Sequence, residues 1–179
     1  MNDSLESEAM DYVLRLMSLS ARTSPKTAGI DDILLKVVVG EEKRKIAEEM
    51  YKLAKERGIA NFDRDARSIE NSHGILLIGI RKDAGTINLN CGACGFDCDE
   101  LKDLKKQGLD FYGPNCAYKF LDMGIALGSA AKTAATLNAD SRIMYRAATA
   151  AMRIGIMSDV SVALAIPISG TGKNIFFDR

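Results

Sequence analysis

The chain has 179 residues, of which 47% are hydrophobic, and this is enough for one domain with a substantial core. Its 24 acidic and 24 basic residues balance, and neither sign forms a long block, which argues against a nucleic-acid-binding surface and a polybasic membrane patch. No apolar run approaches the roughly 20 residues needed to span a bilayer, and nothing at the N-terminus resembles a signal peptide. We therefore expect a single cytoplasmic domain, residues 1–179, without a nucleic-acid or membrane partner.

The first third of the chain predicts a helix, a strand and a second helix. Apolar residues recur at helical spacing over residues 4–20, the pattern of an amphipathic helix. A loop broken by proline and glycine leads to residues 33–39, a short β-branched run typical of a buried strand. A second helix is predicted over residues 41–57, with Gly58 at the position of a C-terminal cap.

The next segment predicts a connector over residues 61–72 and then a central strand. Residues 74–80 form a continuous apolar run, which is consistent with a strand buried on both faces. His73, the only histidine, precedes this run, and a lone histidine there is more often a hydrogen-bonded loop residue than a catalyst. Residues 86–90 predict a short strand that leads into a cysteine-rich segment.

All four cysteines lie in one window, Cys91-Gly-Ala-Cys94-Gly-Phe-Asp-Cys98 followed by Cys116. Four thiols that can converge on one centre indicate a metal site or two disulfides, and the expected cytosolic location disfavours disulfides. The short spacing of the first three brings their sulfurs together in a tight loop, as is common for iron–sulfur clusters. A structural zinc site more often has two separated pairs of ligands. The spacing therefore favours a 4Fe-4S cluster over zinc, with an unmetallated group of thiols as the third alternative.

The residues around the cysteines agree with a cluster. Gly92 and Gly95 are small enough for backbone N–H groups to approach the sulfides of a cluster. A short charged helix is predicted over residues 99–107, ended by Gly108. If Cys116 lies in the first turn of the helix that follows, the positive end of that helix would stabilise its thiolate.

The second half of the chain predicts two further helices and a last strand. The first helix covers residues 114–137, the second is capped by Asp140 or Ser141 and ends at Gly155, and the strand covers residues 160–168. Both helices are predicted to be buried, either inside one subunit or across a homodimer. Small residues recur along the first of them and would let another backbone approach: Gly124, Gly128, Ala131 and Ala135.

The C-terminal Gly170-Thr-Gly-Lys-Asn differs from a nucleotide-binding phosphate loop. That motif requires glycine where Pro167 stands and serine or threonine where Asn174 stands, and too few residues follow for the helix that holds the phosphates. We interpret the segment as a polar tail after the last strand.

Several segments together resemble one known family, an uncharacterised prokaryotic family described as containing a ferredoxin domain. The segments are the cysteine motif, Gly113-Pro-Asn-Cys116, Asp122-Met-Gly-Ile-Ala, residues 138–146 and residues 166–179. The resemblance runs over nearly the whole chain. It implies an iron–sulfur segment over residues 86–118, with the cysteines as ligands of a 4Fe-4S cluster: Cys91, Cys94, Cys98 and Cys116.

The order of the predicted elements also resembles the nitroreductase fold. This resemblance implies an α/β or α+β domain with a small central sheet packed between helices, an intertwined homodimer, and FMN bound at the interface. The residues that match the flavin surroundings of that family are Arg22, Lys26, Lys173 and Arg179. The arginine-rich opening that holds the flavin phosphate there has no counterpart in this sequence.

We therefore predict an iron–sulfur electron-transfer protein with a redox partner protein. The first alternative is an FMN-dependent oxidoreductase supplied with electrons by the cluster. The second is a non-catalytic structural protein with a zinc site or redox-sensing cysteines. No general base, nucleophile or oxyanion site stands out, so the sequence assigns no substrate.

Overall fold

The computed structural model describes residues 5–59 and 61–177. Its centre is a four-stranded antiparallel sheet in the order β1-β2-β6-β5. These strands are β1 (Ile33–Val38), β2 (Gly74–Arg81), β5 (Asp140–Ser141) and β6 (Val160–Ser169). This small sheet between helices confirms the predicted fold class.

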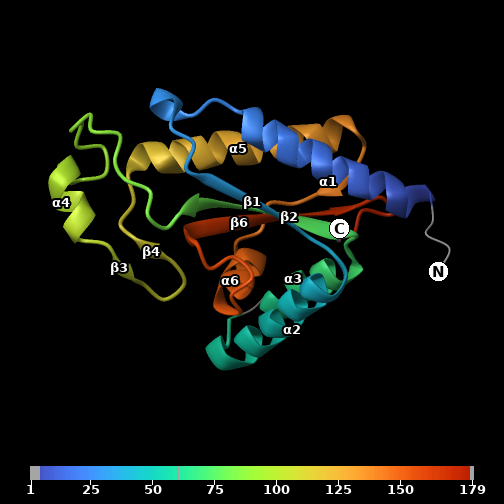
Figure 1. Cartoon of the computed structure of the whole chain (residues 1–179). Helices are drawn as coiled ribbons and strands as arrows, with labels where there is room; N and C mark the ends of the chain where they lie inside the picture. The colour runs from blue at the N-terminus through green and yellow to red at the C-terminus, as the bar shows by residue number, and fades with distance from the viewer. Residues whose placement is uncertain (1–4, 60, 178–179) are drawn as a thin grey trace.

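Helices cover both faces of the sheet (Figure 1). On one face, α1 (Leu5–Thr23) packs along α5 (Ala117–Thr136). On the other lie α2 (Gly40–Arg57), α3 (Phe62–Asn71) and α6 (Tyr145–Arg153). Because both faces are covered, β2 is buried along its length except at Arg81, as its continuous apolar run predicts.

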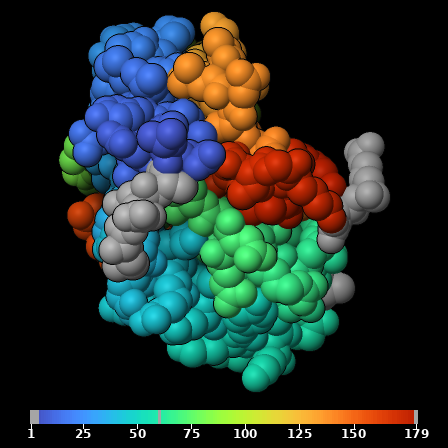
Figure 2. All heavy atoms as spheres, turned by 90° about the vertical axis from the view of Figure 1, so that its right-hand side faces the viewer, coloured from blue at the N-terminus to red at the C-terminus, as the bar shows by residue number. Residues whose placement is uncertain are grey.

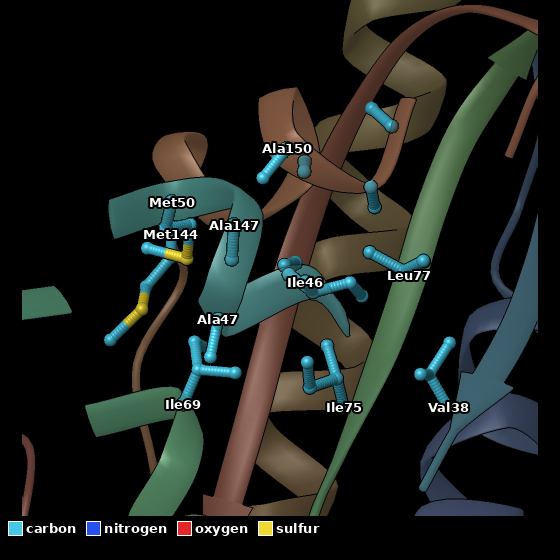
Figure 3. Close-up of a cluster of buried hydrophobic side chains, with 14 of the residues drawn as sticks. Val38, Ile46, Ala47, Met50, Ile69, Ile75, Leu77, Met144, Ala147 and Ala150 are labelled. Atoms are coloured by element: carbon cyan, nitrogen blue, oxygen red, sulfur yellow. The ribbon is translucent and has the colours of Figure 1, made fainter. Parts of the chain in front are cut away.

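The side chains of β2 divide between two cores because successive residues of a strand point to opposite faces. Leu76, Ile78 and Ile80 join the core under α1 and α5. Ile75 and Leu77 join the core under α2, α3 and α6, shown in Figure 3. In that core the three helices and Met144, the residue before α6, contribute mostly alanine and methionine side chains beside two isoleucines: Ile46, Ala47, Met50, Ile69, Met144, Ala147 and Ala150. Each fully buried large side chain contributes about 1.5–3 kcal/mol to folding.

Several details of the helix boundaries and loops agree with the sequence. Gly58 caps α2 with φ of 60°, and its N–H donates to the carbonyl of Ala54 at 3.1 Å. His73 is a hydrogen-bonded residue at the start of β2, with Nε2 2.9 Å from Asp11 Oδ1. None of the helices in the described ranges is long and apolar enough to cross a membrane.

Four local predictions are wrong. The expected connector over residues 61–72 is mostly the helix α3. Residues 86–90 form no strand, the helix expected over 99–107 is only α4 (Cys98–Asp103), and residues 140–141 form β5 rather than a helix cap. Two short strands, β3 (Lys106–Gln107) and β4 (Tyr112–Gly113), form a hairpin after α4.

Candidate metal centre

The cysteine-rich segment leaves the sheet at the end of β2 and returns to the body of the protein at the start of α5. In Figure 1 it extends to the left as a yellow-green loop, α4 and the β3–β4 hairpin, at the end of the molecule opposite to the N and C labels. None of the four cysteines belongs to either core.

All four cysteines line one small cavity between this loop and the start of α5. Cys91 is exposed, Cys94 and Cys98 are half-buried, Cys116 is buried, and all four are free thiols. The cavity has a volume of about 10 Å³, roughly the space of one water molecule. Among the described residues, no three histidine, cysteine or acidic side chains converge as ligands for one metal ion. The four thiols thus share a small cavity without converging on one point.

Two glycines and two asparagines determine the path of the loop. Gly92 and Gly95 have φ of 70° and 87°, and the N–H of Gly95 donates to the carbonyl of Gly92 at 2.9 Å. This hydrogen bond closes a tight turn over residues 92–95, and both glycines adopt a left-handed conformation that favours glycine. Asn88 and Asn90 also have positive φ, 53° and 46°, which asparagine tolerates better than most residues.

Hydrogen bonds connect the loop to the start of α4. The N–H of Asn90 donates to Cys98 Sγ at 3.3 Å, and Asn90 Oδ1 accepts from the N–H of Cys98 at 2.9 Å. Asp97 caps α4 by accepting from the N–H groups of Asp99 and Glu100. Hydrogen bonds from N–H groups to a cysteine sulfur orient the sulfur as a metal ligand and influence the redox potential of a bound metal centre.

Cys116 occupies the N-cap position of the 20-residue helix α5. The sequence-based placement near the start of a helix is therefore confirmed. The N-terminal end of α5 carries a partial positive charge, which attracts negatively charged groups. Because α5 packs against the sheet, the position of Cys116 is fixed by the core of the protein. The other three thiols lie in the loop, which has no such support.

Two lysines lie near Cys116 in the fold. Lys119, one turn after Cys116, is almost fully buried, and its Nζ lies 2.7 Å from Asp32 Oδ2. The two atoms are close enough for an ion pair but are not aligned as a hydrogen bond. Lys105 donates from Nζ to the carbonyl of Ala84 at 2.6 Å. Burial lowers the pKa of Lys105, while nearby acidic groups and Cys116 act in the opposite direction.

The sequence analysis missed both lysines. Lys119 had a signal, since it is one of few charges in an otherwise apolar helix. Lys105 had none, because it stands among other charged residues and only the turn back from α4 places it near Cys116.

An ion pair attaches the β3–β4 hairpin to the body of the protein. Arg57, at the end of α2, makes two hydrogen bonds to Asp110 at 2.6 and 3.1 Å, and Tyr145 Oη also donates to Asp110. The side chains of Arg57 and Asp110 are only 14% and 8% exposed. Phe111 adds an edge-to-face contact with Tyr145, with ring centroids 5.5 Å apart.

The structure does not bring the predicted flavin residues together within one chain. Arg22 binds Asp31 and the carbonyl of Ile33, and the ammonium group of Lys26 binds carbonyls at the end of α1. Both lie where β1 begins. Lys173 follows β6 at the opposite end of the sheet, and Arg179 lies outside the described residues.

The contact between the C-terminal tail and α1 shows how far Arg22 lies from the tail. Gly170 packs against Met10, and Figure 2 shows the C-terminal residues in red beside the dark blue start of α1. Arg22 lies twelve residues farther along α1, about 18 Å at the rise of an α-helix. The two ends of the predicted flavin site are therefore far apart within one chain.

Comparison with solved structures identifies the fold. The FMN-dependent nitroreductase of Mycobacterium smegmatis, solved with NADPH, superposes with a TM-score of 0.60 at 11% identity, over 90% of this chain and 78% of the other. A putative nitroreductase of Desulfovibrio desulfuricans, solved with FMN, has a TM-score of 0.58 at 12% identity, over 94% and 78% of the two chains. At such low identity the likeness establishes a nitroreductase-like fold alone.

Comparison of sequences identifies the family. Residues 112–179, which include Cys116, match a family model described as "Uncharacterized protein containing a ferredoxin domain". A protein of Archaeoglobus fulgidus, described as uncharacterized, is 46% identical over 175 residues, which are 97% of this chain and 94% of the relative. The chain therefore belongs to the family of uncharacterized proteins that contain a ferredoxin domain.

Proposed function

We propose that this chain is an iron–sulfur electron-transfer protein whose 4Fe-4S cluster is held by Cys91, Cys94, Cys98 and Cys116. The observation that carries this proposal is that the four cysteines, the last separated from the others by α4 and a hairpin, line one cavity. The ferredoxin domain in the family description supports the same chemistry.

The donor set fits a cluster, and the size of the cavity requires the loop to open. Four thiolates are the usual ligands of a 4Fe-4S cluster, which accepts and releases single electrons when bound. Cys116 would provide the fixed ligand, and the exposed loop would move outward with the other three. The N–H of Asn90 and the charge of Lys105 would offset the negative charge of the thiolates.

Metal analysis after reconstitution without oxygen tests this proposal. Protein supplied with iron and sulfide should become brown and contain about four iron atoms per chain, as expected for a cluster with four cysteine ligands. A chain that takes up one equivalent of zinc and no iron under these conditions would instead support the zinc alternative. We also infer a cytoplasmic location, because cluster assembly requires reduced thiols.

An FMN-dependent oxidoreductase is the second candidate, and an exposed apolar face supports it. Large side chains on the outer surfaces of α1 and α5 are uncovered: Tyr12, Leu16, Leu19, Phe120, Leu121 and Ile125. Between them, Gly124 and Gly128 have nothing within 4 Å of the position of an added Cβ atom. We infer that a second copy of the chain covers this face, because burying such a surface stabilises an association.

A homodimer would also supply the flavin residues that one chain keeps apart. Arg22 and Lys26 of one subunit would have to meet Lys173 and Arg179 of the other near the FMN phosphate, which needs positive charge and donors. Solved nitroreductases with this fold contain FMN, which makes the cofactor the first to test.

Light scattering combined with FMN titration tests this second candidate. We expect a mass twice the 19.4 kDa of the chain and quenching of flavin fluorescence in the micromolar range. Arg22→Ala should weaken binding, whereas Arg15→Ala, an exposed arginine earlier on α1, should not. A monomer, or no quenching at about 100 µM FMN, equivalent to a binding free energy weaker than about −5.5 kcal/mol, would reject it.

A further inference from the structure

A second cavity lies directly beside the cysteines, and we propose that it binds a small organic anion with an apolar body. Its volume is about 760 Å³, within the roughly 300–1,000 Å³ typical of small-molecule sites. It is formed by the end of β2, the turn that follows, α4 and β4. Thr86 and Leu101 line both this cavity and the cysteine cavity.

The charges around the cavity favour an anion. Four cationic residues line it, Arg81, Lys82, Lys102 and Lys105, against two carboxylates, Asp83 and Asp159. Arg81 lies 3.8 Å from Asp83, and Lys102 pairs with Asp99 outside the cavity at 2.8 Å. Lys82 and Lys105 have no ion-pair partner among the described residues, and Asp159 offsets only one of them. The lining therefore retains an excess of positive charge.

Lys105 is the anchor for the negative group of the ligand. Its ammonium group has three N–H donors, and the carbonyl of Ala84 accepts one of them. The other two can donate to a carboxylate or phosphate oxygen. Burial lowers the pKa of Lys105 more than the nearby carboxylates of Asp83 and Asp32 raise it, so a bound anion would compensate the ammonium group for the water it has lost.

Lys82 is the second uncompensated lysine that lines the cavity. Its Nζ lies 5.1 Å from the centre of the Tyr112 ring, a cation–π contact that holds the side chain over the cavity wall. The two uncompensated lysines and the Tyr112 ring thus line the same cavity.

The rest of the wall selects an organic molecule rather than a bare inorganic ion. Leu34, Ala84, Leu101 and Tyr112 provide apolar and aromatic surface. A bare inorganic anion would leave this surface in contact with water, whereas an aliphatic or aromatic acid would bury it.

A consequence for electron transfer rests on the proposed function. Because the two cavities share Thr86 and Leu101, a bound anion would lie beside the cluster. Negative charge added to the cluster by reduction should weaken binding of the anion, and by reciprocity the anion should make reduction harder.

Benzoate and benzamide are suitable probes because they share the apolar ring and differ in charge. Binding to the full chain is measured by ligand-observed NMR in low salt. We expect benzoate to bind with a Kd of about 1 mM, typical of a fragment of this size, and benzamide about tenfold more weakly. Lys82→Gln and Lys105→Gln should each raise the benzoate Kd about tenfold. Lys106→Gln, the neighbouring exposed lysine on β3, is the matched control and should change it less than twofold.

These measurements test the anion site independently of the proposed iron–sulfur cluster. Lys82 is exposed, so Lys82→Gln should keep the unfolding midpoint of the parent chain and remain informative if Lys105→Gln does not fold. Equal binding of benzoate and benzamide, or equal effects of the Lys82 and Lys106 variants, would overturn the anion site. The measurement is made on metal-free and reconstituted protein. A chain that takes up no iron but binds benzoate through Lys82 would reject the cluster and retain the anion site.

Discussion

Replacing Asp110 by asparagine is expected to detach the cysteine-rich segment from the body of the protein and to lower the free energy of unfolding by about 3 kcal/mol. The substitution leaves the guanidinium of Arg57 14% exposed and without its carboxylate. Removing one partner of a nearly buried ion pair is costly because the remaining charge has lost its water without compensation. Tyr145 loses its charged acceptor in the same step.

Urea unfolding and hydrogen exchange measure the two effects separately. Asp110→Asn should lower the urea midpoint and speed amide exchange in residues 104–113. Asp103→Asn is the matched control, since Asp103 is an exposed carboxylate of the same segment at the end of α4. It should change stability by less than about 0.5 kcal/mol. Equal stability of the two variants would mean that the ion pair does not hold the hairpin.

The same carboxylate makes stability depend on pH in acid. Burial raises the pKa of Asp110, but hydrogen bonds from Arg57 and Tyr145 outweigh this and bring the pKa below its ordinary value. A carboxyl whose pKa is lower in the folded state stabilises the fold above its ordinary pKa of about 3.9, and this stabilisation is lost as the pH falls through the folded value. Stability of the parent chain should therefore fall below about pH 4, and less steeply in Asp110→Asn.

The elements that the sequence predicts well are those whose pattern is local. β2 and β6 are continuous apolar runs, and α1, α2 and α5 have long apolar stripes, so each could be recognised without its neighbours. The helix α3 was missed because its ten residues are mostly charged or polar. Its apolar stripe consists of Phe62, Ala66 and Ile69, and three residues are too few to distinguish a helix from a polar connector by sequence alone.

The short elements depend on tertiary contacts. β5 has two residues and exists because Asp140 and Ser141 pair with the end of β6. The β3–β4 hairpin has two residues in each strand and is held by Asp110, whose partner Arg57 lies far away in the sequence. Propensity cannot predict such elements, because their stability comes from residues that the chain brings together only on folding.

The candidate site also contains some features that a local sequence pattern predicts and others that arise only from tertiary contacts. The cysteines could be predicted because their spacing is itself the signal. The buried pair of Lys119 and Asp32, the half-buried Lys105 and the second cavity could not, since each joins segments from different parts of the fold. The flavin residues Arg22 and Lys173 illustrate the opposite case, because a likeness in sequence order predicted a meeting that one chain alone does not make.

Replacing Cys116 by serine is expected to abolish cluster binding. Cys116 is the only cysteine at the start of a long helix, so in the proposed centre it would be the fixed ligand and the loop would supply the other three. A serine oxygen is a poorer ligand for iron than a thiolate, and it adds no other group that could take its place. Iron after anaerobic reconstitution should therefore fall from about four atoms per chain to less than about one.

Tyr118→Phe is the matched control for the loss of iron, because Tyr118 lines the same cavity but offers no sulfur. It should retain its iron. Thermal unfolding gives a second measurement, because a group that binds only the folded chain raises its stability. Reconstitution should raise the unfolding temperature of the parent and of Tyr118→Phe but not of Cys116→Ser. The metal-free forms of all three should unfold within a few degrees of one another, since a buried thiol exchanged for a hydroxyl costs about 1 kcal/mol. Four iron atoms in Cys116→Ser would show that the cluster is held without Cys116 and would remove the structural basis of the proposed centre.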